Sequence, residues 1–158
     1  MNIHDAALGY LAKRPRTEYQ LREYLNKKGF PGEEIDEVLK DLREMHYVDD
    51  LRFCKEYYAY GSSKGKSINL IKYELQGNGI DGFVIEDALA AMEEEENIDL
   101  QGEEARRALE MAENIARKNV GGDTSKLPGK IGRRLKGLGY DSDLIYRIVG
   151  KYMKEDHE

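Results

Sequence analysis

The sequence contains a single cysteine, Cys54, among its 158 residues. One thiol excludes an intramolecular disulfide and suits a reducing compartment. No apolar run approaches the roughly 20 residues that a membrane-spanning helix needs. The N-terminal stretch MNIHDAALGYLAKR has neither the uninterrupted apolar centre nor the small-residue cleavage site of a secretory signal. We therefore expect a soluble, cytoplasmic protein that does not bind membranes.

Patterns of catalytic and metal-binding residues are also scarce. His4, His46 and His157 are far apart in the sequence, and none has a second ligand at helical spacing. Gly77 and Gly79 end an apolar helical pattern, whereas a phosphate-binding glycine loop opens a helix after a strand. The acidic residues suit helix caps and solvated faces and form no isolated pair in an apolar setting. The sequence thus predicts no catalytic residue, no metal site and no cofactor, and we do not expect an enzyme.

The composition is polar for a single compact core. Charged residues make up 35% of the chain and hydrophobic residues 40%, with a mean hydropathy of −0.74. Small helical units that each bury one thin apolar seam have this kind of composition. The net charge of −6 and the pI near 5.3 argue against a free-standing nucleic-acid-binding protein, which is normally basic.

One pattern of apolar residues and glycine occurs three times. Leu21 and Leu25 share one face of a helix, Gly29 follows as a left-handed helix stop, and a second apolar helical series comes after it. The same order recurs 50 residues and then a further 60 residues along the chain. The matching positions are Leu21, Leu25, Gly29, Phe30, Ile35, Val38, Leu39 and Leu42; Ile71, Leu75, Gly79, Ile80, Ile85, Ala88, Leu89 and Met92; and Ile131, Leu135, Gly139, Tyr140, Ile145, Ile148, Val149 and Tyr152. Three copies in register indicate a tandem repeat.

A further helix precedes each pair. The first covers residues 3–13 and is ended by Pro15, while Thr17 with Gln20 forms a capping box for the next helix. Ser67 occupies the place of Thr17 in the second copy, and the third copy opens with a longer helix over residues 103–119. We read no strand. The sequence predicts an all-α fold of three tandem three-helix repeats, 1–46, 47–97 and 98–158, in an elongated, curved array.

The caps of two helices are left open by the sequence. Asp49 or Asp50 can cap the helix that carries Cys54, and Asp141 or Ser142 can cap the last helix.

Basic residues recur beside the start of the second helix in every copy. From residue 126 to 140 there are five basic residues and no acid, in a chain that is acidic overall. Such a patch can meet phosphates or an acidic protein surface, although a solvated helix face is the alternative. Repeated patches suit a periodic partner, because weak contacts add as avidity. The basic residues are Lys13, Arg14, Arg16 and Arg22; Lys64, Lys66 and Lys72; and Lys126, Lys130, Arg133, Arg134 and Lys136.

Tyrosines crowd one short helix at Tyr57, Tyr58 and Tyr60. Successive helical residues are about 100° apart, so the three rings cannot all face inward and at least one should be exposed. We take Tyr57 and Tyr60 as candidate contact residues, since exposed tyrosines often anchor interfaces. A lone surface aromatic is the alternative.

The chain resembles the RecX family, the small regulators of the RecA recombinase. The resemblance is close over residues 6–92 and looser in the third copy. It rests on Phe53 and on several short strings: Ala7-Leu8-Gly9-Tyr10-Leu11, Arg14-Pro15-Arg16-Thr17, Lys28-Gly29-Phe30, Tyr47-Val48-Asp49-Asp50, Gly65-Lys66, Glu74-Leu75 and Gly79-Ile80.

The resemblance implies an all-α, non-enzymatic protein that binds the groove of RecA filaments on single-stranded DNA. Such proteins lower RecA ATP hydrolysis and strand exchange and promote filament disassembly in recombination and DNA repair. The family's loop before the second helix of repeat two is usually richer in arginine than residues 62–66. With the acidic pI, this favours binding to the filament over binding to bare DNA, and we expect a monomer. From the residues alone, a helical DNA-binding module and a generic protein-interaction scaffold stay open.

Overall fold

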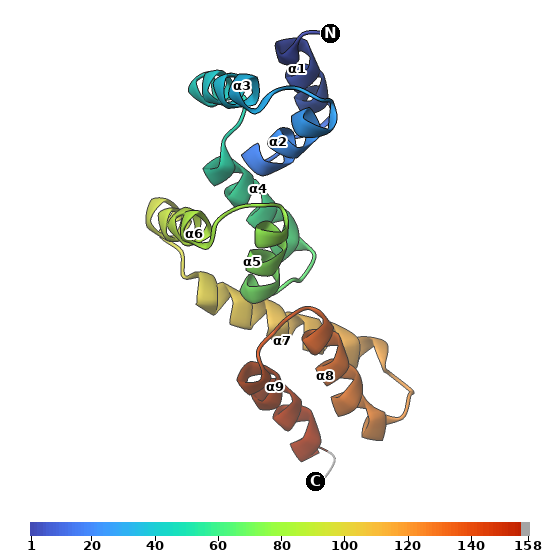
Figure 1. Cartoon of the computed structure of the whole chain (residues 1–158). Coiled ribbons are helices and arrows are strands. Elements are labelled where there is room, and N and C mark those ends of the chain that lie inside the picture. Colours follow the sequence, from blue (N-terminus) through green and yellow to red (C-terminus); the bar gives the residue numbers. More distant parts are fainter. Residues whose placement is uncertain (156–158) are drawn as a thin grey trace. The chain divides into compact units, whose positions relative to one another are not determined.

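The computed structural model describes residues 1–155, and all regular structure in this part of the chain is helical (Figure 1). The predicted all-α class is therefore confirmed. The α-helices are α1 (Ile3–Lys13), α2 (Glu18–Lys27), α3 (Gly32–Glu44), α4 (Asp50–Ser63), α5 (Ile68–Gly77), α6 (Gly82–Glu96), α7 (Leu100–Lys118), α8 (Leu127–Gly137) and α9 (Ser142–Glu155). A short 3₁₀ helix, Thr124–Lys126, precedes α8.

The start of α7 is the main difference from the predicted helix boundaries. The helix begins at Leu100, three residues before the predicted start at Glu103. Leu100 is buried, so the extra turn adds apolar contact, and Asp99 stands at the N-cap position.

Contacts divide the chain into two compact units. The first unit contains Met1–Tyr57 and Tyr73–Met92, and the second contains Tyr58–Lys72 and the chain from Glu93 onward. Helices α4, α5 and α6 contribute residues to both units. The second copy of the sequence pattern is therefore shared between units, and the three-repeat boundaries stay a prediction.

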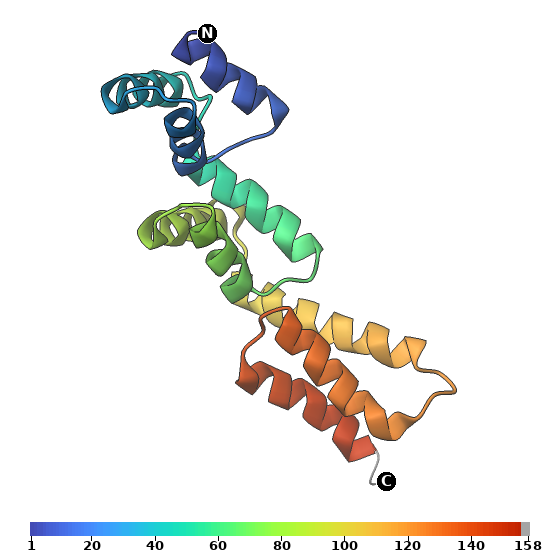
Figure 2. The ribbon, with the colours of Figure 1, turned by 45° about the vertical axis from the view of Figure 1, so that its right-hand side comes forward.

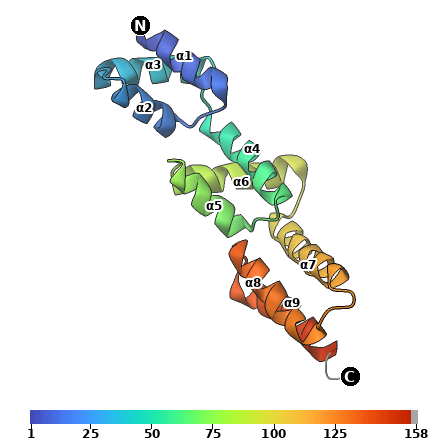
Figure 3. The same cartoon turned by 90° about the vertical axis from the view of Figure 1, so that its right-hand side faces the viewer.

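Each unit has its own apolar core. In the first unit α1, α2 and α3 pack on one another, as the blue helices of Figure 2 show. In the second unit α7 packs on α8 and α9 (Figure 3), and Figure 2 shows α8 and α9 side by side. The buried cluster of the first unit is Ala6, Ala7, Leu21, Leu25, Ile35, Val38, Leu39, Leu42 and Val48. That of the second is Ala108, Ala112, Leu127, Ile131, Leu135, Leu138, Tyr140, Leu144 and Ile148.

The three predicted glycine stops are confirmed. Gly29, Gly79 and Gly139 have φ of +91°, +89° and +90°. After α2, the Phe30 N–H donates to the Leu25 carbonyl at 3.2 Å and the Gly29 N–H donates to the Asn26 carbonyl at 3.0 Å. The same pair of hydrogen bonds follows α5 and α8. This is the Schellman arrangement, which satisfies carbonyls that a helix end leaves without partners.

The predicted capping box at Thr17 and Gln20 is also present. Of the two open cap assignments, Asp49 caps α4 by accepting the Arg52 N–H at 3.2 Å, and Asp141 caps α9 in the same way. Asp50 instead binds the start of another helix, since its carboxylate accepts the N–H of Glu18, the first residue of α2, at 3.0 Å. Burial raises the pKa of Asp50, and the hydrogen bond from Glu18 opposes that rise.

In the first unit, the N-terminal end of α2 packs against the glycine stop that follows α5. The Thr17 hydroxyl donates to the carbonyl of Asn78 at 2.7 Å, and the Gln20 side-chain amide donates to Asn78 Oδ1 at 2.7 Å. Tyr19 lies directly against Gly79, where any side chain would overlap the Cβ and ring of the tyrosine. We call this contact, between a helix start and the glycine stop of the next copy, the joint.

A second joint occurs within the second unit. The Ser67 N–H donates to the carbonyl of Leu138 at 2.9 Å. A Cβ on Gly139 would lie 2.5 Å from Ser67 Oγ and 2.7 Å from Leu70 Cβ. Gly79 and Gly139 thus serve two purposes, a left-handed backbone and a close approach. Gly29 serves only the first, because nothing lies within 4 Å of the position its Cβ would occupy.

This difference can be measured by replacing Gly29 and Gly79 separately with alanine. Both substitutions put a side chain at positive φ, which costs about 1–2 kcal/mol. Gly79→Ala should cost about 1–3 kcal/mol more, because overpacking against Tyr19 forces the joint to shift. Urea unfolding followed by circular dichroism gives both values, and equal losses would contradict the close approach at Gly79.

The hydroxyl of Thr17 should matter more than its methyl group. Thr17 is fully buried, and its hydroxyl accepts the Gln20 N–H and donates to the Asn78 carbonyl. Thr17→Val leaves both groups without a partner and should lower the free energy of unfolding by about 2 kcal/mol. Thr17→Ser keeps both bonds and should cost about 1 kcal/mol or less, for one buried methyl group. Similar losses for valine and serine in urea unfolding would show that the hydroxyl does not stabilise the joint.

Candidate functional site

Two predicted contact residues, Arg14 and Arg16, lie in the loop between α1 and α2. Pro15 stops α1, which keeps the loop short. The Arg16 guanidinium carbon lies 4.0 Å from the centroid of the Tyr10 ring, and Tyr10 is stacked on Tyr24 with the centroids 4.0 Å apart. This stacking orients the guanidinium before any partner arrives.

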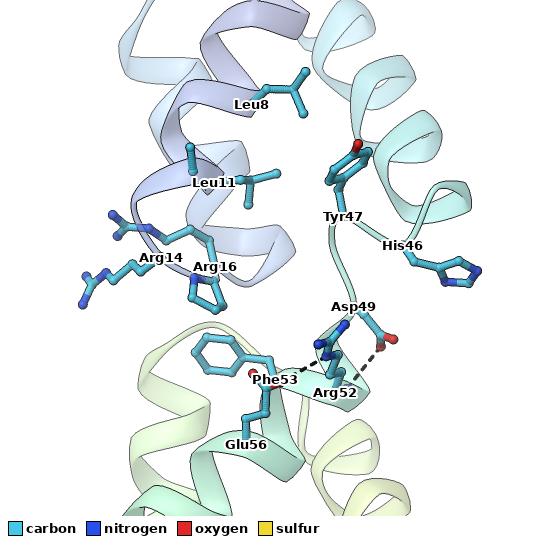
Figure 4. Close-up of a pocket in the computed structure, with 12 residues that line it drawn as sticks. Leu8, Leu11, Arg14, Arg16, His46, Tyr47, Asp49, Arg52, Phe53 and Glu56 are labelled. Carbon is cyan, nitrogen blue, oxygen red and sulfur yellow. Dashed lines mark hydrogen bonds and ion pairs between the residues drawn. The ribbon is translucent and has the colours of Figure 1, made fainter.

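A pocket of about 460 Å³ lies between α1, this loop and the segment from residue 46 to 56 (Figure 4). Figure 4 shows Leu8 and Leu11 extending from α1 toward Tyr47, with Phe53 below them on α4. Leu8 and Tyr47 are 39% and 59% exposed. The walls of the pocket are thus largely apolar and open to solvent.

The arginines that line the pocket differ in whether an acidic side chain already pairs with them. Arg52 donates from Nε to Glu56 at 3.0 Å, and its backbone N–H is taken by Asp49. Arg14 and Arg16 have no ion pair within residues 1–155. Guanidinium groups bind carboxylates and phosphates in a bidentate manner. The pocket therefore suits an acidic group that carries apolar surface beside it.

Sequence reasoning missed Tyr47 as a pocket residue, although the local signal was present. His46 has φ of +63° and ends α3, and the Tyr47 N–H donates to the Leu42 carbonyl at 2.9 Å. The turn at His46 directs the chain so that Tyr47 faces the pocket.

The equivalent loop of the second unit also places a cation over a tyrosine. Lys64 Nζ lies 5.7 Å from the centroid of the Tyr60 ring, and Tyr60 is 55% exposed. The predicted exposure of at least one tyrosine on α4 is confirmed. Tyr58 is buried, while Tyr57 is half-buried and donates to Glu74 at 2.8 Å.

Two residues that sequence reasoning did not select hold this second loop. Arg107 donates to the Lys66 carbonyl at 3.2 Å, and the Tyr140 hydroxyl donates to the Gly65 carbonyl at 2.7 Å. Burial raises the pKa of Tyr140, and Arg107 opposes that rise. These contacts join residues 41 and 75 positions apart, so no local pattern signals them.

The remaining predicted residues are dispersed over both units and form no single site. Arg22 is paired with Asp36 at 2.7 Å on the surface of the first unit. Lys13 is exposed at the end of α1, and Lys72 is half-buried on α5. The basic residues at the end of the 3₁₀ helix and on α8 are all exposed, as a solvated or binding face would be: Lys126, Lys130, Arg133, Arg134 and Lys136.

Within the described residues, no group of three or more histidine, cysteine, aspartate or glutamate side chains could hold a metal ion. His4 faces Asp41 at 3.5 Å, and His157 lies outside the described residues. In the same part of the chain, no helix is long and apolar enough to cross a membrane.

The fold defines an all-helical protein built from three-helix domains. Two domain models describe such units and match this chain: the first three-helix domain of RecX at residues 4–42 and the second at residues 49–89. Regulatory protein RecX of Haemophilus influenzae (strain 86-028NP) is 32% identical, over 92% of this chain and 91% of its own length. The chain belongs to the RecX family.

Other relatives differ in length. Regulatory protein RecX of Clostridium botulinum (strain Alaska E43 / Type E3) is 30% identical over 97% of this chain and 69% of its own length. For Bacillus pumilus (strain SAFR-032) the identity is 29%, and this chain spans about half of that relative, 54% of its length. The crystal structure of RecX from Lactobacillus salivarius matches 95% of this chain with a TM-score of 0.76 at 22% identity, which supports the fold.

Family membership confirms the predicted resemblance. The relatives are named regulatory proteins, in agreement with the expectation that the chain is not an enzyme.

The single thiol offers a test of the core around α4. Cys54 is fully buried, and burial raises the pKa of its thiol to about 11. At pH 8 the thiolate fraction should be about two hundredfold below that of an ordinary cysteine with pKa near 8.5. Ellman's reagent should therefore react at least about a hundredfold more slowly with the native protein than with the protein in denaturant. Rapid reaction of the folded protein would show that the thiol is accessible.

Proposed function

We propose that this chain regulates RecA by binding RecA filaments assembled on single-stranded DNA. Bound there, it lowers ATP hydrolysis and strand exchange and shortens the life of the filament. The observation that carries the proposal is membership of the RecX family, with a relative aligned over more than nine tenths of both chains. The protein acts in the cytoplasm as a monomer of three-helix repeats.

Physical features of the two units support this function. The loops at residues 14–16 and 64–66 end at a buried helix cap that belongs to a joint. The joints therefore fix the backbone positions from which the basic side chains of these loops extend. A filament repeats the same surface at regular intervals, and several weak contacts to such a partner add as avidity. The proposed contact residues are Lys13, Arg14, Arg16, Arg22, Tyr57, Tyr60, Lys64, Lys66, Lys72, Lys126, Lys130, Arg133, Arg134 and Lys136.

These residues do not contribute equally in the proposal. Arg14 and Arg16 lie beside an apolar pocket, and Arg133 and Arg134 are exposed on α8. Arg22 is paired within the unit, so replacing it should change binding least. Bare DNA is a weaker partner, because the chain carries a net charge of −6.

A titration of RecA ATP hydrolysis on single-stranded DNA tests the proposal. Addition of the chain should lower the hydrolysis rate in a saturable manner. The double variant Arg133→Glu and Arg134→Glu should need about a fivefold higher concentration for the same effect, because exposed charges act on encounter and binding. The matched control is Lys40→Glu with Lys118→Glu, which makes the same charge change at two exposed lysines of α3 and α7.

Three outcomes separate the alternatives. Unchanged hydrolysis together with no sedimentation of the chain with filaments would contradict regulation of RecA and favour a scaffold for another partner. Equal affinity for bare DNA and for the filament, with a steep salt dependence, would favour a DNA-binding module. Equal loss in the test and control variants would assign the effect to net charge and not to α8.

A further inference from the structure

Helix α9 carries two apolar stripes, of which the core covers one fully and the other only in part. Leu144 and Ile148 are buried against α7 and α8. Ile145, Val149 and Met153 follow one another at intervals of four residues and form a second stripe. The first two are half-buried and Met153 is 51% exposed.

The other copies of the repeat show that this second stripe is unusual. Ile145 and Val149 correspond to Ile35 and Leu39 in the first copy, which are 0% and 1% exposed. The corresponding residues of the second copy, Ile85 and Leu89, are 1% and 5% exposed. The repeat pattern therefore predicts buried side chains at Ile145 and Val149, whereas in the structure both pack against the core with one side and stay half-buried.

This second stripe lines a groove of about 850 Å³ between α8 and α9, which lie side by side in Figure 2. Gly129 and Gly132 of α8 also line it. A Cβ on Gly132 would make ordinary contacts with Val149 at 3.7 Å and Ile145 at 4.0 Å, so packing does not require glycine there. The missing side chains leave room for another backbone to approach. At 1.5 Å per residue, α8 is about 16 Å long, which matches about three turns of a docked helix.

The charges that line the groove are mostly positive. Arg133 and Lys136 of α8 are exposed and line it. Asp141 is the one acid among the described lining residues, and its carboxylate already accepts the Leu144 N–H at 2.9 Å. Tyr146 of α9, 82% exposed, adds a large aromatic surface.

We propose that the α8/α9 groove binds an amphipathic helix of a partner protein whose apolar face is flanked by acidic residues. The apolar stripe and the glycines accommodate the apolar face, and Arg133 and Lys136 pair with the flanking carboxylates. Nucleic acid fits less well, since phosphates would meet the two cations and leave the aliphatic side chains uncovered. Arg133 and Lys136 are also among the proposed filament contacts, but the test of this groove contains no RecA, so its result is independent of filament binding.

Synthetic peptides provide the probe. The first has leucines at i, i+3, i+4 and i+7 with glutamates beside them, and the second has lysines in place of the glutamates. Fluorescence anisotropy with the full chain should show the acidic peptide binding at least about tenfold more tightly than the basic one. Arg133→Gln with Lys136→Gln should remove most of this preference, whereas the control Lys40→Gln should not.

Two further variants distinguish binding in the apolar groove from binding to the positive charges alone. Tyr146→Ala should weaken binding of the acidic peptide about fivefold, with Tyr73→Ala, another highly exposed tyrosine, as its control. Gly132→Ala should also weaken binding, although alanine favours the helix and makes only ordinary contacts, so thermal stability should not fall. Weaker binding by a variant that is at least as stable cannot be attributed to unfolding.

Several results would overturn the proposal. One is equal affinity for the acidic and basic peptides, and another is unchanged binding in both Tyr146→Ala and Gly132→Ala. A single-stranded oligonucleotide that competes with the peptide and depends on Arg133 and Lys136 but not on Tyr146 would reassign the surface to phosphate binding. Self-association in sedimentation velocity that Tyr146→Ala abolishes would identify a second copy of this chain as the occupant.

Discussion

The structure depends on one repeated contact, in which a helix start is seated on the glycine stop of the next copy of the pattern. In the first unit the Thr17 hydroxyl accepts its own helix's N–H and donates to the Asn78 carbonyl. One buried group therefore satisfies two backbone groups that helix ends leave unpaired. The close approach is available only because Gly79 and Gly139 carry no side chain. A tandem array of small units has little core per unit, so such a joint is a large part of what makes neighbouring copies cohere.

The same contact explains where the basic loops lie. Arg14 and Arg16 come immediately before Thr17, and Lys64 and Lys66 come immediately before Ser67. Because the cap residues are buried and hydrogen-bonded, the preceding loops are fixed at one end, and tyrosines of α1 and α4 support their cations. The same short segment thus stabilises the fold, through its cap residue, and carries the basic residues proposed for recognition. A substitution at the cap should alter both, whereas a substitution of the loop cations should alter only binding.

Local signals predicted most of the fold. The glycine stops, the capping box and the apolar series depend on contacts within a few residues, so the sequence pattern was sufficient for them. The joint could not be predicted, because Thr17 and Asn78 are 61 positions apart and each already has a plausible local role. Arg107 was missed for a similar reason: its partners lie on another element, and a polar helix face gives no sign of them. For the candidate site, Arg14 and Arg16 were predicted from charge, but the apolar pocket beside them required the tertiary contact of α1 with the chain around Tyr47.

The third copy departs from the other two in a way that the joint makes understandable. Its counterpart to Thr17 and Ser67 is Leu127, which is packed in the core and has no hydroxyl to offer. A 3₁₀ turn precedes it in place of a buried polar cap. The N-terminal end of α8 therefore lacks the polar side chain with which α2 binds a glycine stop. The buried pair of the earlier copies, Ile35 and Leu39, also becomes the half-buried pair Ile145 and Val149. Residues that are fully covered in the earlier copies thus keep a core contact here and also expose apolar surface. In the proposal, a repeat protein gains a binding surface of this kind when one copy departs from the pattern while the others maintain the fold.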